Sequence, residues 1–385
     1  MKIALVREKY TDFGGAERYL ANLAEHLLMS GHEVHIFAHE WNSRGMKHSE
    51  ASRFHVHKVP VIRGLSVLKV ISFAINVRRL LKQEQFDIIH SFERTLYQDV
   101  YRAGDGCHRE WLLQRRQIDP WYKRISIRLN PLHIVLLAIE RRIFKDGNYR
   151  MIIANSDRGK REIVHHYGVP SERITVIYNA VDQDRYILND SDEARTQIRK
   201  SLAIPSTDRV LLFVGSGFRR KGLRATMQAL SELDSTMRLI VVGKDRVRSY
   251  RKLAEALGIK NRVHFTGPVV DTERYYNASD LFIFPTIYEP FSNVCLEAMA
   301  AGLPVVTSMI NGASEAVTEG ENGFIVKNPV DAHEIARKIQ EGLGLSRASL
   351  REFNSELLKK FSWKQHMEKL SKVYEDLMWK NRQNA

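Results

Sequence analysis

Short runs of apolar and β-branched residues recur along the chain, and segments with helical spacing of their apolar positions separate them. In the first half these runs predict strands at residues 2–6, 33–39, 87–91, 151–156 and 174–180. In the second half they predict strands at residues 209–215, 237–243, 262–267, 280–285 and 304–307. Strands that alternate with helices are typical of parallel sheets built from βαβ units, so we expect an α/β fold.

A polar segment without strand pattern separates the two halves, at about residues 182–205. The 385 residues suffice for two domains that each bury a core. We therefore expect an N-terminal domain over residues 1–182, a linker, and a C-terminal domain over residues 205–362.

The segment after residue 362 has the pattern of an amphipathic helix. Ser362 and Gln365 form a capping box, and an apolar face follows, made of Met367, Leu370, Tyr374 and Leu377. This helix either packs on its own domain or crosses back, with residues 365–385, to the N-terminal domain.

Charge is the unusual feature of the composition. The chain has 59 Lys and Arg against 45 Asp and Glu, a net charge of +14, which favours anionic partners. Its 2 cysteines imply no disulfide framework and favour a reducing, cytoplasmic location. The longest apolar tracts contain Lys69 or fall well below the roughly 20 residues that span a bilayer, so no transmembrane helix is predicted.

A candidate anion site lies in "FPTIYEPFSNVCLEAMAAGLP". Ser292 is a good N-cap, and the backbone N–H groups of Asn293 and Val294 would point from the positive end of a helix toward a phosphate. Glu297 falls in the second turn of that helix, whereas Glu289 precedes it on the loop.

A basic turn follows a strand in "FVGSGFRRKGL", where Arg219, Arg220 and Lys221 could neutralise a diphosphate. The Walker A spacing is absent. An earlier turn, "DFGGAERYL", carries Gly14 and Gly15, which would let a ligand approach the backbone closely. Taken singly, either turn could be an ordinary loop.

Together, "FGGAER", "RRKG", "IYNAVD" and the Glu-x7-Glu of "EPFSNVCLE" resemble the family 4 glycosyltransferases of the GT-B fold over nearly the whole chain. The segment "YQDVYRAGDGCHREW" is similar to the lipopolysaccharide core glucosyltransferases of that family. The resemblance implies two Rossmann-like, doubly wound domains facing a cleft. It further implies retaining, metal-independent transfer of a hexose from a nucleotide sugar, UDP-glucose, to an inner-core heptose or similar lipid-linked glycan, with no cofactor.

The resemblance also assigns roles to individual residues. Arg220 and Lys221 match the phosphate-binding pair, Glu289 the group that binds the donor sugar, and Glu297 the ribose-binding carboxylate. The remaining donor contacts implied are Gly15, Phe265, Gly267, Pro268, Ser292, Asn293 and Val294.

In the first domain, Asp105 of "AGDGC" matches a residue that orients the sugar, and Glu17 and Arg18 are candidate acceptor contacts. Tyr19 departs from the acidic residue expected there. With Glu297 on the ribose, Glu289 has no second carboxylate for a covalent mechanism. The family's usual proposal is that the leaving phosphate accepts the acceptor's proton. The Asp190-Ser191-Asp192 triplet lies in the polar linker, and we interpret it as a solvated charge pair.

Residues 109–142 form a basic tract with interleaved aromatic residues and a net charge of +5 from eight basic and three acidic side chains. It favours contact with an anionic membrane surface, which would place the protein peripherally on the inner face of the cell membrane. The candidate contacts are Arg109, Trp111, Arg115, Arg116, Trp121, Lys123 and Arg124. For the tract itself, the alternative is an amphipathic insertion packed on the domain. For the protein, the alternatives are a GT-B epimerase, a family 4 enzyme of another polysaccharide or glycolipid pathway, and a basic nucleic-acid- or membrane-binding protein without catalysis. No nucleic-acid-binding motif is present, so we expect no nucleic-acid partner.

Overall fold

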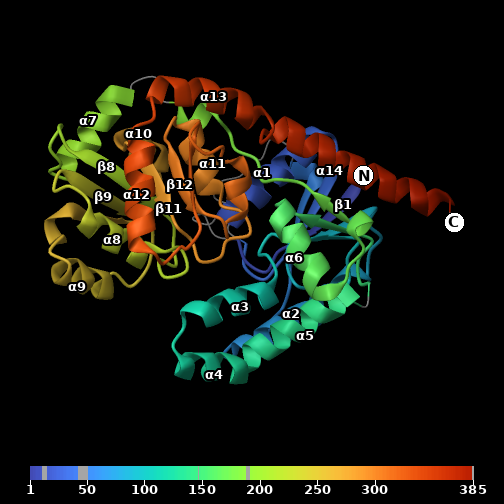
Figure 1. The fold of residues 1–385 in the computed structure, drawn as a ribbon. Coiled ribbons are helices and arrows are strands. Elements are labelled where there is room, and N and C mark those ends of the chain that lie inside the picture. The colour runs from blue at the N-terminus through green and yellow to red at the C-terminus, as the bar shows by residue number, and fades with distance from the viewer. Residues whose placement is uncertain (11–14, 42–50, 146, 188–190, 384–385) are drawn as a thin grey trace. The chain divides into compact units, whose positions relative to one another are not determined.

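The structure, a computed structural model, describes residues 1–10, 15–41, 51–145, 147–187 and 191–383 (Figure 1). The chain divides into two compact units. Unit 1 combines Met1–Tyr178 with His366–Ala385, and unit 2 is Asn179–Gln365.

The described part of unit 1 is built on a sheet of seven parallel strands in the order β3-β2-β1-β4-β5-β6-β7. Its strands are β1 (Lys2–Val6), β2 (Glu33–Ala38), β3 (Phe54–Lys58), β4 (Ile88–Ser91), β5 (Val100–Arg102), β6 (Met151–Ala154) and β7 (Ile174–Val176). The central strands are buried on both faces, as expected of a parallel sheet covered by helices.

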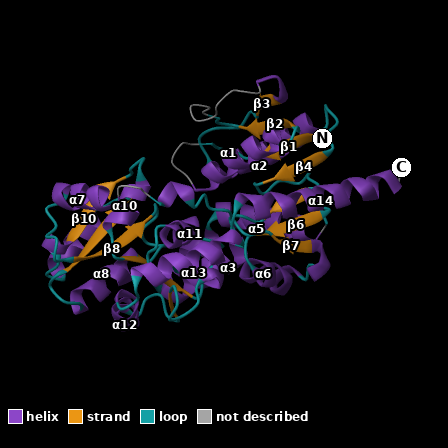
Figure 2. Ribbon diagram, turned by 90° about the horizontal axis from the view of Figure 1, so that it is seen from above, coloured by secondary structure: helices purple, strands orange, loops and turns teal. Residues whose placement is uncertain are grey.

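Helices surround this sheet, and the strands of each unit lie among them in Figure 2. The helices of unit 1 are α1 (Gly15–Met29), α2 (Ser66–Leu81), α3 (His108–Ile118), α4 (Trp121–Leu129), α5 (Pro131–Lys145), α6 (Asp157–Tyr167) and α14 (Trp363–Gln383). Within the part of the chain that the structure describes, none of the helices is long and apolar enough to span a bilayer.

Unit 2 has, among its described residues, six parallel strands in the order β10-β9-β8-β11-β12-β13. They are β8 (Arg209–Val214), β9 (Met237–Val242), β10 (Val263–Gly267), β11 (Leu281–Phe284), β12 (Val305–Ser308) and β13 (Gly323–Val326). The helices are α7 (Ser191–Ser201), α8 (Leu223–Glu232), α9 (Arg248–Ala256), α10 (Thr272–Ala278), α11 (Asn293–Ala300), α12 (Ala332–Leu343) and α13 (Arg347–Lys359). Short 3-10 turns occur at Ala51–Arg53, Ser171–Arg173, Asp184–Tyr186, Lys260–Arg262 and Gly312–Ala316.

The last helix, α14, belongs to unit 1 over most of its length. Oγ of Ser362 accepts the N–H of Gln365 at 3.3 Å, as the capping box predicts. Beyond this cap, Leu370 and Tyr374 are fully buried, and the Tyr374 hydroxyl lies 2.7 Å from Nδ1 of His90 on β4. The helix therefore completes the core of the first sheet, which is the crossing-back alternative.

The prediction of two parallel α/β sheets is confirmed, and each of the ten predicted strands is present. Three further strands were missed. β3 alternates histidines with apolar residues, β5 has three residues, and β13 opens on a glycine, so none carries a strong apolar run.

The predicted linker is partly wrong, because residues 191–201 form α7, which packs on α10 of unit 2. Its buried apolar positions, Ala194 and Ile198, are four residues apart, a helical spacing too sparse to stand out in the sequence. Asp192 is exposed in the first turn of α7, whereas Asp190 lies outside the described residues.

Candidate active site

The strand order of unit 2 reverses between the adjacent strands β8 and β11. β8 leads through β9 to β10 on one side, and β11 leads through β12 to β13 on the other. Open α/β sheets bind ligands beyond the carboxyl ends of the strands at such a reversal. The loops that leave these two strands, residues 215–222 and 285–292, carry four of the predicted site residues: Arg220, Lys221, Glu289 and Ser292.

Backbone contacts hold the two loops together. The carbonyl oxygen of Arg220 accepts the N–H of Ile287 at 2.8 Å and the hydroxyl of Thr286 at 3.0 Å. Gly222 has φ of +84°, and a Cβ there would lie 2.0 Å from the carbonyl oxygen of Pro285. Only glycine fits this position. Because Gly222 has no side chain, the "RRKG" turn can approach the second loop this closely.

The two loops are also joined by an ion pair between side chains. Nη1 of Arg220 donates to Oε2 of Glu289 at 2.7 Å and to the carbonyl oxygen of Tyr288 at 3.0 Å. Both bonds use Nη1, so the Nε and Nη2 side of the guanidinium fork can face a phosphate. Arg220 and Glu289 were predicted separately, as a phosphate contact and a sugar contact. The ion pair joins them.

Lys221 lies beside this pair, half-buried against the sheet. Its Nζ is 5.2 Å from the centre of the Phe284 ring at the end of β11. Burial lowers the pKa of Lys221, and Arg220 adds to this, whereas Glu289 opposes it. A Cβ on Gly215 would lie 2.5 Å from Nζ, so this glycine leaves the space that the ammonium group occupies. A partly buried cation interacts more strongly with a nearby anion than a cation in open water does.

Helix α11 starts at the predicted position, with Ser292 as its N-cap residue, but the cap differs from the prediction. The Ser292 hydroxyl does not cap a backbone N–H of the helix and accepts instead from Nδ2 of the buried Asn311, at 3.0 Å. Asn311 also donates to Oγ1 of Thr307 at 2.9 Å, so it fixes the helix entry to β12. The first-turn amides of Asn293 and Val294 have no acceptor within an α-helix and therefore suit an anion.

Glu297 lies one turn further along α11, half-buried. Its Oε2 accepts the hydroxyl of Tyr276 on α10 at 2.8 Å. Tyr276 is fully buried, and burial together with the Glu297 carboxylate raises its pKa well above the ordinary value, so the hydroxyl stays a donor. No sequence motif pointed to Tyr276 or to Asn311, because each acts through a residue distant in the chain.

Phe265, Gly267 and Pro268 lie at the carboxyl end of β10, two strands from β8. Gly267 has φ of +76° at an irregularity in the pairing with β9, and its carbonyl accepts the N–H of Gly243 at 2.9 Å. These residues are thus at the same edge of the sheet as the two loops, which is compatible with the base contacts that the resemblance implies.

In unit 1, Asp105 is exposed on the loop after β5 and faces two arginines. Its Oδ2 lies 3.6 Å from Nη1 of Arg7 and 4.0 Å from Nη1 of Arg94. Arg7 follows β1 and Arg94 follows β4, the two strands between which the order of this sheet reverses. Glu93 completes the cluster, with Oε1 3.4 Å from Nε of Arg7. Of these four residues, only Asp105 was predicted.

A fully buried carboxylate, Glu140 of α5, accepts hydrogen bonds from the backbone just after Asp105. Its Oε1 accepts the N–H of His108 at 2.7 Å, and Oε2 accepts the N–H of Arg109 at 3.2 Å and the hydroxyl of Tyr167 at 2.6 Å. Nη2 of Arg94 is 3.4 Å from the same carboxylate. Glu140 therefore caps the start of α3 and fixes the chain that follows Asp105.

The predicted contacts on α1 are only partly described. Gly15 begins α1, Gly14 lies outside the described residues, and the side chain of Glu17 is also outside them. Arg18 is half-buried. Tyr19 belongs to the core, because its hydroxyl is 2.8 Å from Nε2 of His366 on α14 and the Arg102 guanidinium lies 4.3 Å above its ring. An acidic residue at position 19 would be out of place in this packing.

The basic tract forms α3, α4 and α5, and Ile127 is the only buried residue of α4. Of the seven candidate membrane contacts, all but Trp111 and Arg115 are exposed, namely Arg109, Arg116, Trp121, Lys123 and Arg124. Arg115 instead pairs with buried Asp119 at 3.1 Å, Trp111 stacks under Arg115, and Nε of Arg124 donates to the Asp119 carbonyl at 2.8 Å. Arg115 and Arg124 thus brace the turn between α3 and α4.

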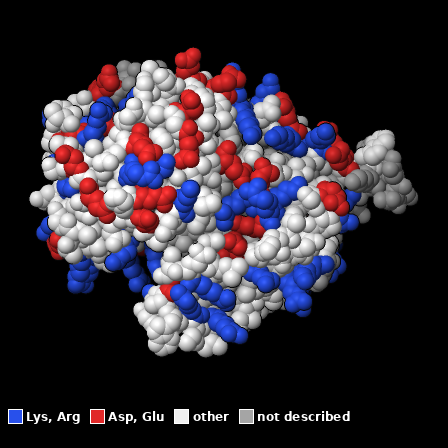
Figure 3. All heavy atoms as spheres, viewed as in Figure 1, with Lys and Arg blue, Asp and Glu red and all other residues white. Residues whose placement is uncertain are grey.

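Helix α2 packs along α5 and adds exposed apolar residues that sequence reasoning missed. They are Leu68, Ile71 and Ile75 on α2, together with Ile62 and Leu65 in the segment just before it. On α4 the exposed apolar residues are Trp121, Tyr122, Ile125 and Leu129. In Figure 3, Lys and Arg side chains gather over the region of α3 to α5 beside uncharged side chains. The exposed residues of α2 and α4 are called the apolar patch below.

Comparison with known families matches nearly the whole chain in two parts. Residues 13–185 match the Glycosyltransferase Family 4 model, and residues 194–355 match the Glycosyl transferases group 1 model.

Comparisons with individual proteins point in the same direction. The chain is 28% identical over 347 residues to the lipopolysaccharide glucosyltransferase WaaG of Escherichia coli, covering 89% of this chain and 90% of that protein. The crystal structure of WaaG, a glycosyltransferase involved in lipopolysaccharide biosynthesis, superimposes with a TM-score of 0.78 at 27% identity, covering 94% of this chain and 95% of that one. HepE of Anabaena, solved in complex with UDP and glucose, shares the fold with a TM-score of 0.73 at 20% identity, covering 97% and 99%.

Proposed function

Because this chain is a glycosyltransferase of the GT-B fold, with a family 4 domain followed by a group 1 domain, we propose that it transfers glucose from UDP-glucose to a lipopolysaccharide inner-core heptose or a similar lipid-linked glycan. The likeness to WaaG over nine-tenths of both chains supports this acceptor class. A family 4 enzyme of another polysaccharide or glycolipid pathway is the alternative, since it would share the donor site and differ at the acceptor.

One observation carries the proposal. Arg220, Lys221 and the N-terminus of α11 all lie at the sheet edge where the strand order of unit 2 reverses. Two cations and two backbone amides at one sheet edge suit a diphosphate. These groups stabilise the negative charge that develops on the diphosphate as the sugar–phosphate bond breaks. They therefore make the diphosphate a better leaving group. Such an arrangement needs no metal, so we propose metal-independent transfer.

For the stereochemistry we propose retention without a covalent intermediate. Glu289 is paired with Arg220 and Glu297 is held by Tyr276, so the two carboxylates are committed to separate partners. In the proposed step the bond from the anomeric carbon to the diphosphate oxygen breaks, and the acceptor hydroxyl oxygen bonds to that carbon on the same face. The departing phosphate oxygen accepts the hydroxyl proton, so the step needs no other base.

The apolar patch supports a peripheral location on an anionic leaflet. A lipid-linked acceptor is held at the membrane, and the aromatic and aliphatic side chains of α4 alternate with Lys123, Arg124 and Arg128. Apolar side chains can enter the lipid interface while basic ones meet the headgroups. We therefore propose that α4 and α2 rest on the inner face of the cell membrane.

A panel of nucleotide sugars tests the function. UDP-glucose, UDP-galactose, UDP-GlcNAc and a GDP-sugar are each assayed with and without a heptose-containing lipopolysaccharide core acceptor, in the presence and absence of EDTA. We expect glucose transfer only from UDP-glucose with the acceptor present, unchanged by EDTA. Turnover with another donor would revise the substrate, and loss of activity with EDTA would overturn the metal-free mechanism.

A second experiment separates the two anionic partners, membrane and nucleic acid. It compares binding to vesicles of anionic lipid with binding to duplex and single-stranded nucleic acid at physiological salt.

A further inference from the structure

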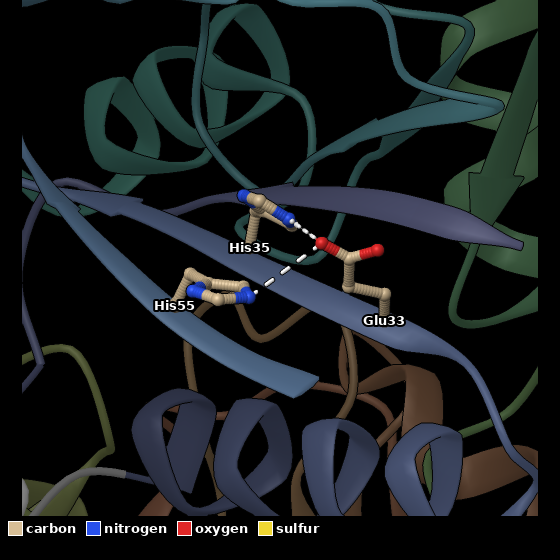
Figure 4. Close-up of side chains that lie close together, drawn as sticks. All are labelled: Glu33, His35 and His55. Atoms are coloured by element: carbon tan, nitrogen blue, oxygen red, sulfur yellow. Dashed lines mark hydrogen bonds and ion pairs between the residues drawn. The ribbon is translucent and has the colours of Figure 1, made fainter. Parts of the chain in front are cut away.

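Three ligand-type side chains converge on one face of strands β2 and β3, at the end of the sheet away from the carboxyl edge. Glu33 and His35 lie two residues apart on β2, so they share a face, and His55 of β3 is the direct neighbour of His35. Figure 4 shows both imidazole rings directed at the same carboxylate oxygen. Their nearest ligand atoms all lie within 4.8 Å of one another.

We propose that Glu33, His35 and His55 form a binding site for a divalent transition-metal cation such as Zn²⁺. Oε1 of Glu33 is 2.8 Å from Nε2 of His35 and 3.5 Å from Nε2 of His55. Ligands at 2.0–2.1 Å in a tetrahedral site are separated by roughly 3.3 Å, a value between these two distances. Two imidazoles and a carboxylate are ligands that zinc prefers, and water would fill the fourth position.

The surroundings of His35 are those of a metal-binding imidazole. Its side chain is only 4% exposed, and its second nitrogen, Nδ1, lies 2.8 Å from Nε2 of His57. A metal-bound histidine donates its other N–H to such an acceptor, which fixes the ring. His57 itself stacks on Phe37 with ring centres 4.4 Å apart, so the ring that would accept this N–H is held in place.

Solvent can reach the site through two of its three side chains. The side chains of Glu33 and His55 are 40% and 41% exposed, whereas His35 closes the inner side. Glu84 and Lys2 pair with each other next to it, and Oε2 of Glu84 lies 4.0 Å from Nδ1 of His35. A second possible ligand set, His35, His57 and Glu84, uses this other nitrogen. Only one set can bind through His35 while its other nitrogen donates. The carboxylate lies closer to His35 in the first set, at 2.8 Å, than in the second, at 4.0 Å.

The position of the site indicates what the ion would do. β3 is the edge strand of the sheet, and the ligands come from β2 and β3, so a bound ion would clip the edge strand to its neighbour. The candidate active site lies at carboxyl ends of strands, whereas Glu33 is the first residue of its strand. The ion would therefore stabilise the fold of unit 1 without taking part in transfer, and the proposal does not depend on the acceptor or donor.

Zinc titration of chelator-treated full-length protein tests the site. We expect one Zn²⁺ per chain by calorimetry, with a Kd of about 1 µM or lower. At a hundredfold excess of zinc over Kd, Tm should rise by roughly 5 °C. Co²⁺ should give the visible absorption of a tetrahedral site with nitrogen and oxygen ligands.

Variants assign the ligands. His55→Ala and Glu33→Gln should weaken zinc binding by about 100-fold or more, and His57→Phe by about 10-fold, as expected for a partner of a ligand. The control is His333→Ala, because His333 is an exposed histidine of unit 2 that pairs only with Glu232 in a similar His–Glu contact. Its zinc affinity should be unchanged. Circular dichroism of each variant shows whether it is folded, and Glu33→Gln preserves side-chain shape.

Two results would overturn the proposal: no saturable zinc binding up to about 100 µM, or binding that His55→Ala and Glu33→Gln leave within about twofold of the unaltered chain. Weaker binding in His57→Phe than in His55→Ala would place the ion in the second ligand set instead and so refute the assignment made here.

Discussion

The hydroxyl of Tyr276 donates a 2.8 Å hydrogen bond to Oε2 of Glu297, and so joins a fully buried ring on α10 to a half-buried carboxylate on α11. The ring cannot move without disturbing the core of unit 2. The carboxylate proposed to bind ribose is therefore fixed before any ligand arrives, which lowers the entropic cost of binding.

Tyr276→Phe should weaken donor binding and leave the chemistry nearly intact. Removing a hydrogen bond to a charged group costs about 1.5 kcal/mol, so KM for UDP-glucose should rise roughly 10-fold while kcat changes less than about twofold. Steady-state kinetics at saturating acceptor measure both. Tyr275→Phe, on the same helix, is the control and should behave as the unaltered chain. A fall in kcat larger than the rise in KM would contradict the assignment of Glu297 to ribose.

Lys221→Ala should reduce turnover far more than acceptor binding. Loss of one preorganised donor to a leaving group typically lowers kcat about 100-fold or more, whereas KM for the acceptor should stay within about threefold. The control is Lys244→Ala, an exposed lysine that follows β9 at the same edge of the sheet. Equal losses in kcat and acceptor affinity would show that Lys221 does not act on the leaving group.

Gly222→Ala should destabilise unit 2 by about 3 kcal/mol or more, because the new methyl group would meet the Pro285 carbonyl and the backbone has positive φ. Gly217→Ala separates the two causes. Gly217 has φ of +76° with nothing within 4 Å, so its substitution should cost only about 1 kcal/mol. Urea unfolding followed by circular dichroism measures both, and similar costs would mean that the loop relaxes away from Pro285.

Stability should fall as pH rises from about 4.5 to 7 because of Glu93. Burial raises its pKa to about 7, with Arg7 opposing and Asp105 adding to the shift. In this window the folded chain retains a proton that the unfolded chain has released, so raising the pH favours unfolding. With its side chain 22% exposed, the effect should be about 2 kcal/mol.

Glu93→Gln should remove that part of the pH dependence, measured as the free energy of unfolding in urea at pH 4.5 and 7.5. The exposed Glu172→Gln serves as the comparison and should keep the slope. An unchanged slope in Glu93→Gln would mean that Arg7 neutralises the carboxylate fully.

Replacing Trp121 and Leu129 of α4 together with serine should reduce binding to anionic vesicles at least 10-fold, because each side chain contributes about 1.5–3 kcal/mol when it leaves water. Sedimentation with vesicles measures the bound fraction. Trp379→Ser is the matched control, since Trp379 is a comparably exposed tryptophan on α14, outside the apolar patch. If the double variant binds as well as the unaltered chain, another surface meets the membrane.

The sequence predicts the strands that have long apolar runs and the start of α11, because each has a local cause. Apolar runs predict β1 and β8, and Ser292 marks the start of α11. What sequence cannot supply is pairing across long separations. The Arg220 bond to Glu289 and the Tyr276 bond to Glu297 depend on which strands are neighbours. Asp105 was predicted, yet Arg7 and Arg94 were not, because the three meet only through the order of β1, β4 and β5.

Helix α14 also has a consequence for protein synthesis. Leu370 and Tyr374 lie in the core of unit 1, but the ribosome makes them only after all of unit 2. While the chain is being translated, the first sheet lacks the helix that covers His90, so its apolar surface stays open to chaperones until residues 366–377 emerge. Unit 2 is contiguous in sequence and can complete its own core first.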